Sequence, residues 1–135
     1  MTKDIFILDS YAFIAYIEKE AGYQKVVELL KDGEKGSIRI LLNLINWGEI
    51  YYSAFRLRGE QKAEETLLLI DQLPIELISV DRDFIYQAAR LKAQYRIAFG
   101  DCFAAALTIR EQGCLLTGDK EFKKMGEKMR IKWLP

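Results

Sequence analysis

Histidine is absent from this chain of 135 residues, and cysteine and proline each occur only twice. Without an imidazole, the chain cannot assemble a Ser/His/Asp or Cys/His catalytic relay. An enzyme built from this sequence would need another source of its base and its electrophile. Clustered carboxylates that hold a hard divalent cation are the obvious substitute.

The two cysteines, Cys102 and Cys114, form no CxxC pair, and no histidine is present to complete a zinc ligand set. We therefore expect no structural zinc site. Cys102 lies in a helical run of small residues, and Cys114 begins an apolar, strand-like run. This setting predicts two buried free thiols in preference to a disulfide.

Long hydrophobic runs are also missing near the N-terminus. The apolar run from Ile5 to Leu8 stops at Asp9 and is far too short for a signal sequence or a membrane span. We therefore expect a cytoplasmic protein with no membrane partner. Lysine and arginine, 20 residues, balance aspartate and glutamate, 20 residues, so a nucleic-acid partner would need a local basic patch.

Composition and length indicate one ordinary globular unit. Half of the residues are apolar and 30% are charged, which separates the chain from disordered and collagen-like classes. At this length we expect residues 1–135 to form a single domain.

Strand-like and helix-like segments alternate along the chain. Apolar runs predict strands at 5–8, 38–42, 75–80 and 114–117, with a candidate edge strand at 131–134. Helical spacing of apolar residues, ended by glycine or proline, predicts helices at 10–20, 24–31, 43–59, 60–73, 81–95 and 100–113, and a short helix after Asp119. This alternation predicts a three-layer α/β/α domain with a central, mainly parallel sheet.

Four acidic residues occupy positions from which they could reach one crevice. Asp9 and Asp119 directly follow predicted strands, and ligands bind beyond the carboxyl ends of parallel strands. Asp101 begins a helix after Gly100, and Glu49 lies about two turns inside the helix that follows the second strand.

Each acidic residue also has a plain structural interpretation. Asp9, Asp101 and Asp119 could be helix N-caps, and Glu49 could be an exposed helix position beside a lysine or arginine. If the four converge, each close pair repels by about 4 kcal/mol at an effective dielectric constant near 20, so a cation must lie among them. Mg²⁺ or Mn²⁺ would suit such an oxygen site, although spacing alone leaves the convergence open.

The sequence around these four acids resembles the four acidic motifs of PIN domains, in the same order and spacing. The matching strings are Ile7-Leu8-Asp9-Ser10, Leu44-Ile45-Asn46-Trp47-Gly48-Glu49, Gly100-Asp101-Cys102-Phe103-Ala104-Ala105-Ala106 and Leu116-Thr117-Gly118-Asp119-Lys120-Glu121-Phe122. The resemblance spans nearly the whole chain. The compact size is most similar to VapC-type toxins of prokaryotic toxin-antitoxin pairs.

The resemblance implies a metal-dependent endoribonuclease with a PIN-like fold. Its catalytic and metal-binding residues would be Asp9, Glu49, Asp101 and Asp119, arranged around Mg²⁺ or Mn²⁺. Ser10 and Thr117 would supply hydroxyls that orient carboxylates or water. An antitoxin partner and a homodimer are also implied. Asn46 and Trp47, just before Glu49, are less usual for the family and bear only on local substrate contacts.

For the mechanism, we hypothesise in-line attack of a metal-activated water on an RNA phosphodiester, which leaves a 5′-phosphate and a 3′-hydroxyl. Arg96 and Lys120 are the first candidates for contacts with the RNA backbone, followed by Lys92, Lys123 and Lys124. The alternative is that these basic residues simply solvate helix faces.

Several other features have competing interpretations. Asp81 and Asp83 open a helix and are explained by capping and the helix dipole, so we exclude them from the site. The aromatic positions Trp47, Tyr51, Tyr52 and Phe55 could stack bases, or could form core or a subunit interface.

Two alternative functions remain open from the sequence. A phosphotransferase could use Asp9 as its nucleophile, but haloacid dehalogenase-like sites want a second aspartate two positions on, where this chain has Tyr11. A noncatalytic protein- or RNA-binding module could use the acidic edge to capture a basic segment of a partner. Metal-dependent phosphodiester cleavage distinguishes the nuclease from the binding module.

Overall fold

The computed structural model describes residues 2–135, and within them five strands form one sheet in the order β3-β2-β1-β4-β5. Every neighbouring pair of these strands is parallel. The strands are β1 (Asp4–Leu8), β2 (Ile38–Asn43), β3 (Glu76–Ile78), β4 (Cys114–Thr117) and β5 (Arg130–Trp133). The expected parallel sheet is confirmed, and the candidate edge strand exists as β5.

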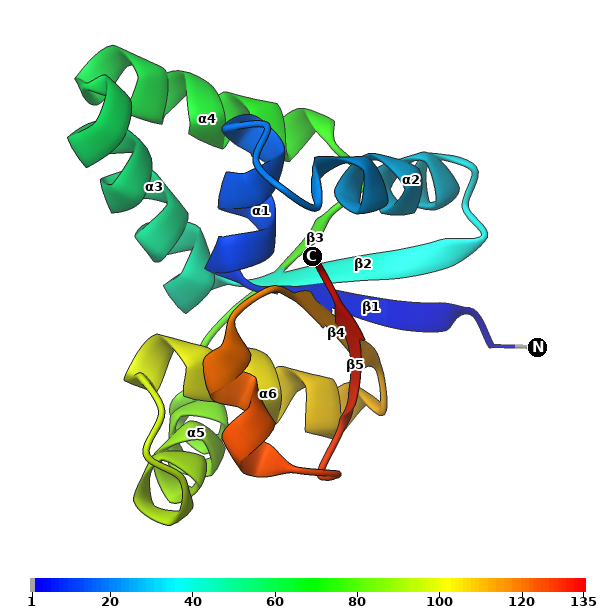
Figure 1. Cartoon of the computed structure of the whole chain (residues 1–135), viewed down its shortest axis with the longest axis vertical. Coiled ribbons are helices and arrows are strands. Elements are labelled where there is room, and N and C mark those ends of the chain that lie inside the picture. Colours follow the sequence, from blue (N-terminus) through cyan, green and yellow to red (C-terminus); the bar gives the residue numbers. More distant parts are fainter. Residues whose placement is uncertain (1) are drawn as a thin grey trace.

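Helices cover both faces of the sheet. They are α1 (Ser10–Ile17), α2 (Tyr23–Glu34), α3 (Leu44–Arg58), α4 (Glu60–Gln72), α5 (Arg82–Gln94) and α6 (Phe99–Glu111), with a 3-10 helix η1 (Lys120–Met125). Figure 1 shows α1 to α4 on one side of the sheet and α5, α6 and the orange-red η1 segment on the other. This arrangement confirms the three-layer α/β/α fold.

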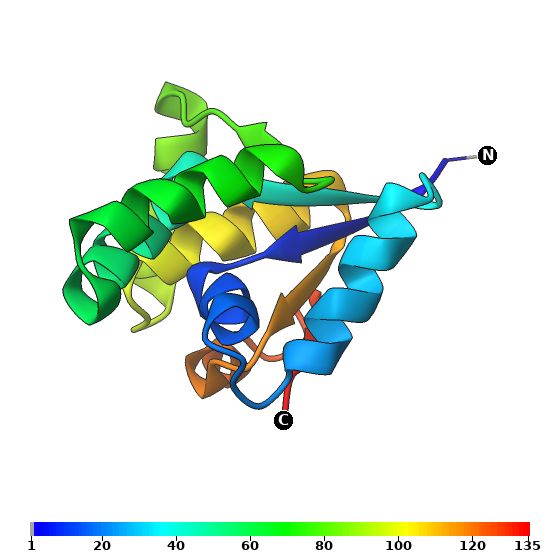
Figure 2. The ribbon, with the colours of Figure 1, turned by 90° about the horizontal axis from the view of Figure 1, so that it is seen from above.

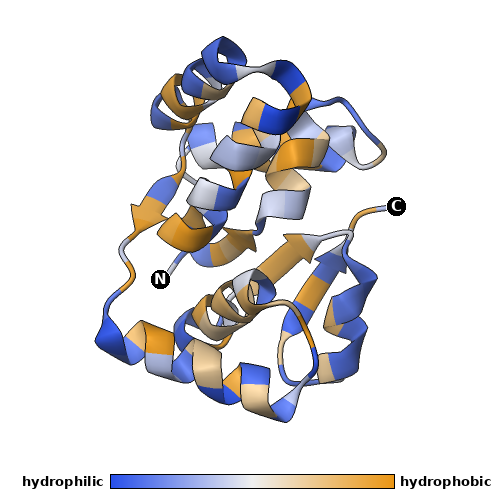
Figure 3. Ribbon diagram, turned by 90° about the vertical axis from the view of Figure 1, so that its left-hand side faces the viewer, coloured by the Kyte–Doolittle hydropathy of each residue, from blue (hydrophilic) through white to orange (hydrophobic). Residues whose placement is uncertain are grey.

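The two faces of the sheet carry separate halves of the core. Ile7 is directly paired with Leu41 on β2 and with Leu115 on β4, and this row packs against α5 and α6. One residue further on, Leu8 and its neighbour Leu116 face α1 and α2. Successive side chains of a strand point to opposite faces of the sheet, so the continuous apolar runs of these strands make both faces apolar. The strands are accordingly mainly orange in Figure 3.

The strand order places a topological switch point between β1 and β4. From β1 the chain moves outward through β2 to β3, and it later returns to the other side of β1 as β4 and then β5. Figure 2 shows β1 and the orange β4 side by side, with arrowheads directed toward the same end of the molecule. Ligand crevices of open parallel sheets form at such a point, beyond the carboxyl ends of the strands.

The third strand is shorter than the apolar run at 75–80 predicted. The pairing of β2 with β3 ends at the pair Asn43 and Ile78, because Asn43 caps α3 and β2 stops there. The next two residues therefore have no β2 backbone to pair with. They lead instead to Asp81, whose side chain accepts a hydrogen bond from the Phe84 N–H at 2.8 Å. This contact confirms that Asp81 caps α5.

The remaining sequence expectations are met in part. Cys102 is buried and Cys114 is half-buried, and both are free thiols. Trp47 packs against the core formed by α1, α2 and α4, whereas Tyr52 and Phe55 are exposed on α3. Among the described residues, no helix is both long enough and apolar enough to span a bilayer.

Two glycines provide a matched test of this packing. A methyl group on Gly113 would lie 2.7 Å from the backbone carbonyl oxygen of Ile5, whereas one on Gly48, inside α3, meets nothing within 4 Å. We predict that Gly113→Ala lowers the free energy of unfolding by about 1–3 kcal/mol through overpacking. Gly48→Ala should raise it by about 0.5–1 kcal/mol because alanine favours the helix. Urea denaturation measures both, and equal effects of the two substitutions would contradict this account.

Candidate active site

Asp9 lies at the carboxyl end of β1 and is almost fully buried. One carboxylate oxygen accepts a hydrogen bond from the Ala12 N–H at 2.8 Å, which makes Asp9 the N-cap of α1. The other accepts a hydrogen bond from the Thr117 hydroxyl at 2.5 Å. The capping interpretation is therefore correct for Asp9, but only one of the two carboxylate oxygens makes the cap.

Thr117 joins the two strands that flank the switch point. Its hydroxyl donates to Asp9 on β1 and accepts a hydrogen bond from the Asp119 N–H at 3.0 Å. Asp119 in turn caps η1, because its carboxylate accepts from the Glu121 N–H at 3.0 Å. The two acids that follow β1 and β4 are thus held by one shared hydroxyl group.

Glu49 is half-buried in the second turn of α3. Its Oε1 accepts hydrogen bonds from the Ser10 hydroxyl at 3.1 Å and from the Asn46 side-chain amide at 2.7 Å. No lysine or arginine pairs with it among the described residues, so the alternative of an exposed glutamate beside a basic residue is wrong.

Asp101 lies in the first turn of α6 but does not cap it. The helix begins at Phe99, and the residue before it, Ala98, provides no side-chain cap. The pKa of Asp101 is raised to about 8, mainly by burial and then by the negative charges of Asp119, Asp9 and Glu49. The capping alternative is therefore wrong for Asp101, and this carboxyl group lies within electrostatic range of the other three.

Asp9 also resists ionisation. Its pKa is raised to about 7: burial is the main cause and the charge of Asp119 adds to it, while the hydrogen bonds from Thr117 and Ala12 act in the opposite direction. Two carboxyl groups of the cluster therefore titrate near neutral pH, several pH units above an ordinary aspartate. Desolvation is the main cause for both groups, and crowding of like charges adds to it.

The four carboxylates do not form a ready-made cage. Among residues 2–135, no group of three or more cysteine, aspartate or glutamate side chains has the arrangement of a metal site. Both oxygens of Asp9 and one oxygen of Glu49 accept hydrogen bonds from neighbouring groups.

The basic residues expected at the substrate lie on the surface nearby. Arg96 is exposed in the loop before α6, and Lys120 is exposed next to Asp119. The backbone carbonyl of Arg96 accepts a hydrogen bond from the Lys124 ammonium group at 3.0 Å, which ties η1 to that loop. In the described part of the chain, neither Arg96 nor Lys120 forms an ion pair with the four carboxylates.

The sequence interpretation missed the role of Asn46 and Gly100. Asn46 is fully buried and donates hydrogen bonds both to Glu49 and to the backbone carbonyl of Gly100, at 3.1 Å. A methyl group on Gly100 would overlap the Glu49 carboxylate. One signal was available in the sequence, because Asn46 and Glu49 are three residues apart and so share a helix face.

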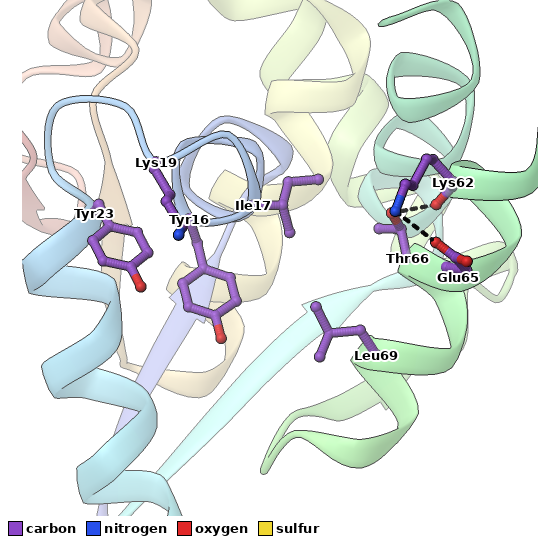
Figure 4. A pocket seen from close by; sticks show the side chains of 8 residues that line it. All are labelled: Tyr16, Ile17, Lys19, Tyr23, Lys62, Glu65, Thr66 and Leu69. Atoms are coloured by element: carbon purple, nitrogen blue, oxygen red, sulfur yellow. Dashed lines mark hydrogen bonds and ion pairs between the residues drawn. The ribbon is translucent and has the colours of Figure 1, made fainter. Parts of the chain in front are cut away.

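A separate cavity of about 350 Å³ lies between α1, the start of α2 and α4. The Tyr16 and Tyr23 rings stack there with their centroids 5.8 Å apart. Figure 4 shows them on one side of the cavity, with the ion pair between Lys62 and Glu65 on the other. The remaining lining residues are Ile17, Lys19, Thr66 and Leu69. None of the four carboxylates lines this cavity, so it is distinct from the acidic site.

Solved structures with the same fold come from toxin-antitoxin systems. VapBC2 from Rickettsia felis, bound to a promoter DNA fragment, aligns with a TM-score of 0.75 and 18% identity over 97% of this chain and 99% of that one. DNA-bound VapBC from Salmonella typhimurium aligns with a TM-score of 0.74 and 17% identity over 98% of both chains.

VapC20 from Mycobacterium tuberculosis, a toxin that cleaves the sarcin-ricin loop, aligns with a TM-score of 0.72 and 13% identity over 90% of this chain and 95% of that one. At these identities the likeness establishes the fold. A search of curated proteins finds no match. The model of the PIN domain matches residues 6–128, which is most of the sequence. The chain belongs to the PIN domain family.

Proposed function

We propose that this PIN domain is a metal-dependent endoribonuclease that hydrolyses RNA phosphodiesters, and that it is the toxin of a toxin-antitoxin system. The observation that carries the proposal is the state of Asp101. Its pKa rises to about 8 through burial and through the charges of Asp119, Asp9 and Glu49, at the end of the sheet where ligands bind. Structural ion pairs do not explain this crowding, because no basic side chain is paired with the group in the described residues.

The donor set suits Mg²⁺ or Mn²⁺. Asp9, Glu49, Asp101 and Asp119 offer only carboxylate oxygens, which are the ligands that these hard cations prefer. Asp9 and Asp101 are the residues we assign as direct ligands first, with Asp119 next and Glu49 as either a ligand or a holder of metal-bound water. When bound, the cation would lower the pKa of a water molecule and neutralise charge on the phosphate.

The hydroxyl and amide groups around the acids would then keep the carboxylates in place. Thr117 orients one oxygen of Asp9, and Ser10 orients one oxygen of Glu49. With water as the nucleophile, in-line attack on the phosphodiester leaves a 5′-phosphate and a 3′-hydroxyl. No imidazole is available to activate a ribose 2′-hydroxyl instead.

The RNA backbone would be contacted by Arg96, Lys120 and the start of the basic C-terminal segment. This segment, residues 120–135, has an excess of positive charge in a chain whose net charge is zero. Its charged residues are Lys120, Lys123, Lys124, Lys128, Arg130 and Lys132 against Glu121 and Glu127. Lys120, Lys123 and Lys124 lie in η1 just after Asp119, whereas Arg130 pairs with Cys114 at the opposite end of the sheet. The phosphate attraction that the whole molecule lacks would therefore come from the lysines of η1.

The partners follow from the same family assignment. The Rickettsia felis and Salmonella typhimurium structures are VapBC complexes bound to DNA, which supports a cognate antitoxin for this chain. We further propose a homodimer, for which the exposed aromatic side chains of Tyr52 and Phe55 on α3 are available. We also propose that the protein works in the cytoplasm.

A noncatalytic binding module is the alternative that one observation favours, because the carboxylates are not preassembled around a metal position. A phosphotransferase is disfavoured. Both oxygens of Asp9 are engaged by Ala12 and Thr117, and Tyr11 occupies the position where a second aspartate would be needed.

Replacement of Asp101 tests the chemistry. We predict that Asp101→Asn reduces Mn²⁺-dependent cleavage of RNA by at least about 100-fold, because it removes a charged ligand without changing the shape of the side chain. Asp81→Asn is the matched control, since asparagine preserves the cap of α5 outside the site, and it should cleave at the wild-type rate.

A chelator should abolish cleavage by the wild-type protein, and end-group analysis should find a 5′-phosphate. A 2′,3′-cyclic phosphate, or full activity of Asp101→Asn, would rule out the proposed mechanism.

The pH dependence of stability tests the electrostatics. The folded-state pKa values of Asp9 and Asp101 lie above their unfolded values, so the metal-free protein should lose stability as the pH rises from about 4 toward 8. We predict a loss of roughly 1–2 kcal/mol between pH 6 and pH 8 for Asp101, allowing for its partial exposure to solvent.

Urea denaturation at the two pH values measures this loss. Asp101→Asn should reduce it, and Mn²⁺ at pH 8 should restore stability to the wild-type protein by mass action. The glutamates whose pKa is lowered by arginine partners, Glu18 and Glu76, titrate below this window and should not interfere. Stability that increases from pH 6 to pH 8 without metal would contradict the prediction.

A further inference from the structure

Two buried asparagines form a hydrogen-bonded pair at the start of α3. The backbone N–H of Asn46 donates to Oδ1 of Asn43 at 2.9 Å, and Nδ2 of Asn43 donates to Oδ1 of Asn46 at 2.8 Å. Neither side chain is accessible to solvent. Because buried amides left without partners are costly, the pairing gives the Asn46 amide a single favourable orientation.

That orientation directs the Asn46 Nδ2 group at the acidic site. It donates one hydrogen bond to Oε1 of Glu49 at 2.7 Å and another to the backbone carbonyl of Gly100 at 3.1 Å. Its two N–H groups therefore bridge α3, which carries Glu49, and the first turn of α6, which carries Asp101 one residue after Gly100.

Gly100 provides the space that this bridge requires. A methyl group at that position would overlap both oxygens of the Glu49 carboxylate, so α6 approaches Glu49 with its backbone. Oε1 of Glu49 is held by Ser10 and Asn46, and its Oε2 lies against Gly100. The Glu49 carboxylate is thus packed between its hydrogen-bond donors and the backbone of α6.

We propose that Asn46 is a positioning residue that fixes the Glu49 carboxylate against α6, so that Glu49 and Asp101 face the same bound cation. The inference rests on the proposed metal-dependent function. Asn43 supports Asn46 by holding its carbonyl oxygen away from Glu49, and Ser10 supplies the second donor to the carboxylate. Hydrogen-bonded supports of this kind typically set metal affinity within a factor of 10–100.

A capping role does not account for the Asn46 side chain. The cap of α3 is made by the Asn43 side chain and the backbone N–H of residue 46, which every residue except proline supplies. Asn46→Leu, which has a similar volume, keeps this cap and removes both donors to Glu49 and Gly100. Asn46→Ser is the second variant, because it keeps the position polar if leucine impairs folding.

Mn²⁺ affinity, measured by calorimetry on the protein without RNA, is the main test. Asn46→Leu and Asn46→Ser should bind Mn²⁺ about 10–100-fold more weakly than the wild type. The matched control is Thr108→Val, which removes a buried hydroxyl that donates to the Ala104 carbonyl within α6. This control loses a comparable buried hydrogen bond and should retain wild-type affinity.

A crystal structure of metal-free Asn46→Leu separates this inference from the proposed function. We expect the Glu49 carboxylate to leave Gly100 in that variant, and a carboxylate that stays in place would overturn the inference whether or not metal binds. Unchanged Mn²⁺ affinity in both Asn46 variants would also overturn it while leaving the proposed function intact. A wild-type protein that binds no Mn²⁺ would overturn the proposed function and the role of Asn46 toward a cation, whereas the variant structure would still decide whether Asn46 fixes Glu49 against α6.

Discussion

The crowding of carboxyl groups at the carboxyl end of the sheet is the constraint on which the rest of this structure depends. Asp101 meets the charges of Asp119, Asp9 and Glu49 in a partly desolvated position, and its pKa rises to about 8 as a result. Asp9, buried at the switch point, has a pKa of about 7. Folding therefore brings together acidic groups whose charged forms are unfavourable there, and a divalent cation is the ligand that we propose relieves this cost.

The surrounding structure holds the acids in this arrangement. The apolar faces of β1 and β4 fix the strand ends in register, and the Thr117 hydroxyl links Asp9 across the switch point. On the other side, Asn46 and Ser10 hold Glu49, and Gly100 admits the backbone of α6. These donors are neutral, so they hold Asp9 and Glu49 in place without pairing either carboxylate with a basic side chain.

Local patterns predicted most of the fold and several of its helix caps. The apolar runs and helix signals correctly indicated the parallel sheet, its three layers and the capping roles of Asp9, Asp81 and Asp119. The prediction was wrong where the outcome depended on a neighbour in space. The strand at 75–80 is shortened because β2 ends at Asn43, and Asp101 is not a cap because α6 begins at Phe99.

The sequence alone determined the chemistry that is available to this protein, namely carboxylates without histidine, carried on a PIN domain that spans most of the chain. Only the tertiary structure decided how those carboxylates meet. The raised pKa values of Asp9 and Asp101 depend on burial and on acidic residues that are distant in the sequence. The hydrogen bond from Asn46 to Gly100 likewise connects two distant segments. Desolvation and Coulomb energy depend on distance in space and on exclusion of water, and a linear pattern of residues specifies neither.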